Sequence, residues 1–107
     1  MKIGVLIELF EDTDIDAKFA ELRSMGMESC QLVCWNRKIL NDDSVAQAVN
    51  EAVEKHGVHI SAFWCGWEGR RVWDFYEGQL TLGLVPTDYR IERMKMLLEG
   101  SDFAKKI

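Results

Sequence analysis

Three short apolar runs are separated by amphipathic segments in the first part of the chain. The runs are KIGVLIEL at 2–9, CQLVCW at 30–35 and HISAFWCG at 59–66, and each is typical of a strand buried on both faces of a parallel sheet. They recur about every 29 residues, which leaves room for one helix in each interval. Strand, helix and strand in this order predict right-handed parallel crossovers, so we expect an α/β fold of three consecutive parallel β/α units.

Capping residues and helical periodicity predict helices between these runs. The first helix is expected to begin after an Asp14 cap and to stop at Gly26, and the second to begin after Asp42 or Asp43 and to stop at Gly57. The expected inward-facing residues are Ile15, Phe19, Leu22 and Met25 in the first helix and Val45, Val49, Ala52 and Val53 in the second.

A long aromatic and glycine-rich connection, residues 66–86, follows the third run and is closed by Pro86. A third helix is expected from Thr87, its predicted cap, and Gly100 is expected to weaken or divide it. The expected inward-facing residues are Tyr89, Met94, Leu97, Leu98 and Phe103. The repeat calls for a fourth strand after Ile107. Helices are expected on one face of the sheet only, so the other face would expose apolar side chains and two strand edges would be unpaired.

Length and charge predict a single domain and argue against some classes of binding partner. With 107 residues, we expect a single domain over residues 1–107. A formal net charge of -5 argues against nucleic acid or an anionic membrane as a partner, because such binding depends on Lys and Arg. The apolar start is interrupted by Glu8, Glu11 and Asp12, which disfavours a signal peptide, and no stretch is long enough to span a membrane. A cytoplasmic protein is therefore expected.

Cysteine chemistry is not expected to carry the function. An odd number of cysteines, Cys30, Cys34 and Cys65, in a cytoplasmic chain favours reduced, buried thiols. A zinc site with His56 and His59 is disfavoured, because no paired CxxC or CxxxH spacing is present and both histidines fall at the start of the third run. No histidine is suitably placed to activate a catalytic thiol.

Five segments of the second half together resemble a known family. They are WCGWEG, VWDFYEG, LTLGLVP, YRIERM and GSDFAKK, and they resemble the amino-terminal portion of the sugar phosphate isomerase/epimerase family of xylose isomerase-like TIM barrels. The resemblance implies a partial (β/α)8 barrel, about three of its eight units. It also implies a divalent metal, Mn, Mg or Zn, held by Glu, Asp and His ligands mostly on later strands. These ligands are carried over to no residue of this chain, which alone is expected to be inactive.

In such a barrel the loops after the strands form the active-site rim, here residues 8–14, 35–41 and 65–86. Flat aromatic faces stack on the C–H faces of sugars, and carboxylates accept hydrogen bonds from sugar hydroxyls. The expected substrate-binding residues are Glu8, Trp35, Trp64, Trp67 and Glu68. Trp73, Phe75 and Tyr76 belong to the same expected cluster, which could equally be a plug that pins the loop by packing. The alternative for the carboxylates Glu8 and Glu68 is that they are charges exposed to solvent. Arg70 and Arg71 could hold a phosphate group or form an exposed salt-bridged pair.

The resemblance implies a metal-dependent isomerase or epimerase that transfers a proton next to a sugar carbonyl. Its partner would be a small sugar or sugar phosphate. The alternatives are a metal-independent carbohydrate-binding or assembly module and, less favoured, a repair protein of the endonuclease IV type, against which the negative charge counts. Self-association through the open sheet edges or the uncovered face is also expected.

Overall fold

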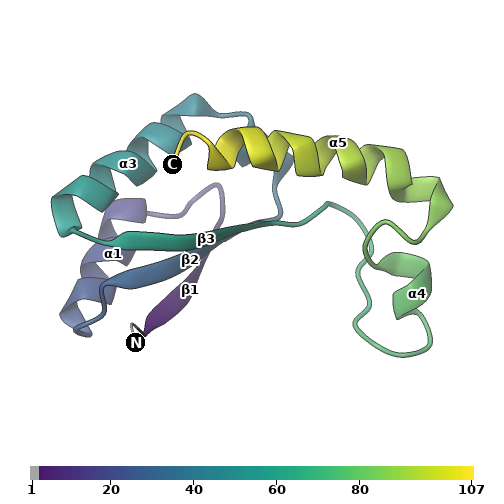
Figure 1. Ribbon diagram of the computed structural model, residues 1–107, viewed down its shortest axis with the longest axis horizontal. Coiled ribbons are helices and arrows are strands. Elements are labelled where there is room, and N and C mark those ends of the chain that lie inside the picture. Colours follow the sequence, from purple (N-terminus) through teal and green to yellow (C-terminus); the bar gives the residue numbers. More distant parts are fainter. Residues whose placement is uncertain (1–2) are drawn as a thin grey trace.

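The computed structural model describes residues 3–107 and contains one parallel sheet of three strands in the order β1-β2-β3. The strands are β1 (Gly4–Leu9), β2 (Ser29–Cys34) and β3 (His59–Cys65). The first predicted strand included Lys2, which lies outside the described residues. The helices are α1 (Ile15–Ser24), α2 (Arg37–Leu40), α3 (Asp43–His56), α4 (Gly78–Thr81) and α5 (Thr87–Ala104). The predicted α/β class with parallel strands and intervening helices is confirmed (Figure 1).

The strand register is regular except at one point. β1 and β2 pair without interruption, but Cys30 pairs with Ile60 and the next residue of β2, Gln31, pairs with Ala62. Ser61 is therefore an extra residue of β3, and its hydroxyl donates to the Cys30 carbonyl at 2.9 Å. Because a bulge shifts the alternation of side chains by one, Ile60 and Phe63 both pack against the same core.

One hydrophobic core fills the space between the sheet and the helices. Phe19 from α1 and Phe103 from α5 are the largest fully buried side chains. They join Val49 of α3 and the strand residues Leu32 and Cys34 in a single cluster. Figure 1 shows α3 and α5 on the upper side of the strands, with α1 behind them. The three long helices thus contribute to the same core.

Local capping explains where α1 and α3 begin and where α3 ends. The Asp14 carboxylate accepts a hydrogen bond from the Ala17 amide at 2.9 Å, and Asp42, rather than Asp43, caps α3 through the Ser44 amide at 2.9 Å. Gly57 follows α3 with a φ of 62°, a left-handed conformation that favours glycine. Met25 was predicted to face inward but is 53% exposed, because α1 ends at Ser24 and Met25 lies past its last turn.

α5 departs from its prediction. It is continuous through Gly100, which is buried, and a Cβ there would lie 2.4 Å from the Cys65 Sγ. The glycine therefore allows α5 to approach β3 closely, and the predicted division of the helix at Gly100 is wrong. Thr87 is not the cap: Pro86 takes that position and no side chain caps the helix.

The inward face of α5 also differs from the prediction. Tyr89, Met94 and Leu98 are 49%, 46% and 66% exposed, although Phe103 is buried as expected. The buried stripe consists of Arg93, Met96, Gly100 and Phe103, which recur at helical spacing. The apolar residues chosen from the sequence span a wider arc than the helix buries.

The sheet face opposite the helices, the uncovered face, carries Leu6, Glu8, Gln31, Val33, Ala62 and Trp64, which alternate with the core residues of each strand. Leu6 is 56% and Trp64 41% exposed, so the predicted exposure of apolar side chains on this face is confirmed. None of the helices described within residues 3–107 combines the length and apolar character needed to cross a bilayer.

Candidate ligand-binding site

The carboxyl ends of the strands bring a carboxylate and a tryptophan onto the uncovered face. Glu8 pairs with Val33, and Val33 in turn pairs with Trp64, so the three side chains form one row across the sheet. Val33 is buried between its two larger neighbours, while Glu8 is half-buried and Trp64 is exposed. Two of the predicted substrate-binding residues therefore flank the same apolar side chain.

Three tryptophans form an edge-to-face group next to this row. The Trp35 ring lies 5.4 Å from Trp64 and 5.6 Å from Trp67, measured between centroids. Gly66 makes room for it, since a Cβ there would lie 1.8 Å from the Trp35 ring. The Arg71 guanidinium carbon lies over the Trp35 ring, 4.2 Å from its centroid. We refer to Trp35, Trp64 and Trp67 as the tryptophan cluster.

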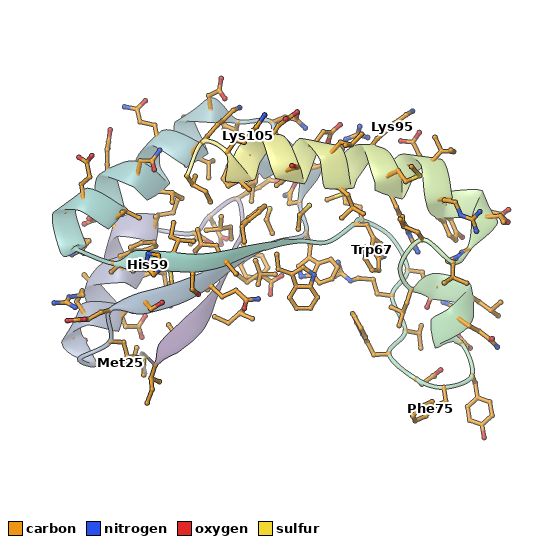
Figure 2. All side chains as sticks on the ribbon, viewed as in Figure 1. Met25, His59, Trp67, Phe75, Lys95 and Lys105 are labelled. Carbon is orange, nitrogen blue, oxygen red and sulfur yellow. The ribbon has the colours of Figure 1, made fainter. Side chains whose placement is uncertain are left out.

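The remaining aromatic residues of the loop do not join the tryptophan cluster. Trp73, Phe75 and Tyr76 are 65%, 102% and 86% exposed, so the prediction of one large aromatic cluster is wrong for them. Asp74 turns the chain here, because its carboxylate accepts from the amides of Tyr76 and Glu77. Figure 2 shows Phe75 at the far tip of the loop, well away from Trp67 under α5.

Glu68 holds the loop to the segment after β2. Its carboxylate accepts from the backbone amide of Arg37, the first residue of α2, at 3.0 Å. The Arg37 side chain binds both carboxylate oxygens of Glu99 in α5, at 2.7 and 2.5 Å, and lowers the pKa of that carboxyl group. Three segments distant in sequence are thereby joined beside the tryptophan cluster.

The two loop arginines are exposed and take different partners. Arg70 forms an ion pair with Glu77, which agrees with the salt-bridge alternative for that residue. Arg71 stacks on Trp35 and donates to the Trp67 carbonyl at 3.2 Å.

Sequence reasoning missed Arg93. This side chain is only 3% exposed, and its guanidinium carbon lies 4.9 Å from the ring centroids of both Trp67 and Tyr89. One feature of the sequence could have revealed it. Arg93 lies at helical spacing from Met96, Gly100 and Phe103, and therefore on the buried face of α5.

The three cysteines are free thiols, and Cys30 and Cys34 are buried. Burial raises the pKa of Cys30 and of Cys65 to about 11, which disfavours their thiolate forms near neutral pH. His56 contacts Asp16 at 2.8 Å. Within residues 3–107 no group of three or more His, Cys, Asp or Glu side chains could hold a metal ion. These residues therefore do not fit the divalent metal that the resemblance implies.

Comparison of the chain with models of protein families, with curated proteins and with solved structures found no match.

Proposed function

We propose that this chain forms the substrate-binding wall of a sugar or sugar-phosphate isomerase/epimerase with a xylose isomerase-like TIM barrel, of which residues 1–107 supply three β/α units. The sheet order β1-β2-β3, with helices on one face, agrees with consecutive units of such a barrel. In this proposal the uncovered face is the inner wall, which further strands would enclose.

The row of Glu8, Val33 and Trp64 carries the proposal. It combines a carboxylate and an aromatic face on one side of the sheet, at the carboxyl ends of the strands, where α/β sheets bind ligands. Trp64 would stack on the C–H face of a sugar ring, and Glu8 would accept hydrogen bonds from its hydroxyls. Trp35 would hold Trp64 in place by their edge contact.

The divalent metal, Mn, Mg or Zn, is assigned to no residue of this chain, and no reaction step is derived through it. Binding of the sugar is therefore the part of the function that the described residues can perform. The chain alone is expected to bind without turnover, and an assay of ketose interconversion with each metal added would contradict this if it detected metal-dependent product.

Titrations with fructose and its epimers, and with the phosphorylated forms of these sugars, test the binding wall when tryptophan fluorescence is followed. We expect saturable quenching that persists in a chelator, and a loss of affinity of roughly tenfold or more in Trp64→Leu. Trp73→Leu is the matched control, because Trp73 is exposed and contacts no other aromatic ring among the described residues. Equal affinity in the two variants would reject the proposed wall.

A second candidate, a metal-independent assembly module, is favoured by the exposed apolar side chains of the uncovered face. Its partner would be a second copy of this chain. Light scattering should then show a mass that rises with concentration, and Leu6→Lys should abolish the rise. Leu98→Lys, at a leucine of α5 that is also more than half exposed, should leave it unchanged. A monomer at all concentrations would exclude self-association.

A further inference from the structure

A small pocket lies on the helical side of the tryptophan cluster, away from the uncovered face. It has a volume of about 180 Å³, and its lining comes from α2, the start of the loop and the first half of α5. Its lining residues are Arg37, Trp67, Glu68, Tyr89, Glu92, Arg93 and Met96. Pockets for drug-sized ligands span roughly 300–1,000 Å³, so only a small molecule or a single functional group fits here.

Arg93 is the buried cation of this pocket. It donates to the Gly83 carbonyl at 2.7 Å and to the Arg70 carbonyl at 3.4 Å, so it anchors the loop to α5. No carboxylate oxygen of residues 3–107 lies within 4.0 Å of its nitrogens. A buried charge without a counter-ion is costly in a protein interior, and burial lowers the pKa of Arg93 accordingly.

Two neighbouring N–H groups in the lining of this pocket have no hydrogen-bond partner. The Arg93 Nε and the Trp67 Nε1 are both buried, and neither has an acceptor in the part of the chain that the structure describes. The guanidinium stacks against the indole at 4.9 Å, so the two donors belong to side chains in direct contact. Buried donors almost always have an acceptor, and neither of these two has one among the described residues.

The carboxylates that line the pocket already have partners. Glu68 accepts from the Arg37 amide, and Glu92 pairs with Lys95 at 2.8 Å and with Arg37 at 3.6 Å. Both are exposed and therefore screened by solvent. Arg93 is thus the cation of the pocket that lacks an ionic partner.

We infer that this pocket binds an oxyanion, a carboxylate or phosphate group of a small ligand, which accepts hydrogen bonds from the Arg93 Nε and the Trp67 Nε1. Arginine with a second N–H donor is well suited to such groups, because its planar nitrogens match two oxygens of one anion. The site is distinct from the sugar wall at Trp64 and does not depend on the proposed function.

Nitrogen-15 NMR of the full chain tests the inference directly, because indole Nε1–H and arginine Nε–H groups give separate signals. Sodium acetate and sodium phosphate are titrated in parallel, with sodium chloride at matched ionic strength. We expect saturable shifts of the Trp67 and Arg93 signals with acetate, phosphate or both, while the signals of Trp64 and Trp73 stay unchanged. The arm that saturates at lower concentration distinguishes a carboxylate from a phosphate ligand.

Two variants separate binding from loop anchoring. Trp67→Phe removes one donor but keeps an aromatic face under Arg93, and should weaken oxyanion binding roughly tenfold or more. Arg90→Lys is the matched control, since Arg90 anchors the same loop through the carbonyls of Leu84 and Val85 outside the pocket. It should retain wild-type affinity.

Absence of saturable shifts with both anions, or equal shifts with chloride, would overturn the inference and leave Arg93 as a loop anchor alone. Shifts of the same two signals with neutral fructose but not with either anion would also overturn it. A failure of the sugar wall would instead be seen at Trp64, so the two proposals fail separately.

Discussion

The two halves of the molecule are held together in different ways. In residues 4–57, all three helices begin at a side-chain cap, α3 ends at Gly57, and α1 packs on α3. In residues 59–107, a long loop precedes α5, which has no side-chain cap and depends on contacts with β3, with α2 and with the loop. The first half is determined by local signals, whereas the second is determined by contacts between distant residues.

Phe19 and Phe103 provide the strongest test of this difference, because they are the largest fully buried side chains and lie in different halves. Replacement of either by alanine should reduce the free energy of unfolding by about 3–5 kcal/mol, since both fill the same core. Denaturant unfolding of the two variants measures this loss.

Amide exchange then sharpens the comparison. Phe19→Ala should lower protection throughout β1 and β2, while Phe103→Ala should lower it most in α5 and β3, which has fewer local supports. Uniform loss of protection in both variants would mean that the two halves unfold as one unit.

Gly100 carries the next largest expected effect. In an open helical position Gly→Ala would stabilise α5 by about 1 kcal/mol, but here the new Cβ would lie 2.5 Å from the Cys65 Cβ. Gly100→Ala should therefore destabilise the protein by about 1–3 kcal/mol through overpacking. Ser101→Ala, at the next and exposed position, should remain within about 0.5 kcal/mol of the wild type. A stabilised Gly100→Ala variant would show that α5 does not approach β3 this closely.

The sequence predicted the first half in detail because its signals are local. The apolar runs marked the three strands, and Asp14 and Gly57 marked helix ends through bonds and dihedral angles within their own turn. Asn36 carried a similar signal that was missed: its side chain accepts from the Lys38 amide and caps the short helix α2.

The second half could be predicted only in outline. The buried stripe of α5 runs through Arg93 and Gly100, two residue types that hydrophobic periodicity does not count. The extra residue Ser61 has no local signature, because the bulge depends on pairing with β2. In the candidate site, Trp64 and Trp67 come together as expected around Trp35, but the Asp74 turn leads the later aromatic residues away.

Helix capping gives a smaller test of the same contrast. Asp14→Ala removes the acceptor for the Ala17 amide and should cost about 1 kcal/mol, measured by denaturant unfolding. Thr87→Ala, at the start of α5, should change stability by less than about 0.5 kcal/mol, since Thr87 caps nothing. Equal losses would imply that α5 also depends on its first side chain.

The smallest expected effect concerns the contact between α1 and α3. Asp16 accepts from Lys55 and contacts His56, both at 2.8 Å, and these hydrogen bonds hold the pKa of its carboxyl group below the ordinary value of 3.8. A folded pKa below the unfolded one stabilises the protein above pH 3.8, and this contribution is lost as pH falls through the folded pKa. Asp16→Asn should therefore be less stable than the wild type at neutral pH, and the difference should shrink in acid. Urea unfolding of Asp16→Asn, Lys55→Met and the double variant on both sides of pH 3.8 measures the coupling between the two side chains. A coupling that does not change with pH would show that this ion pair does not link α1 to α3 in solution.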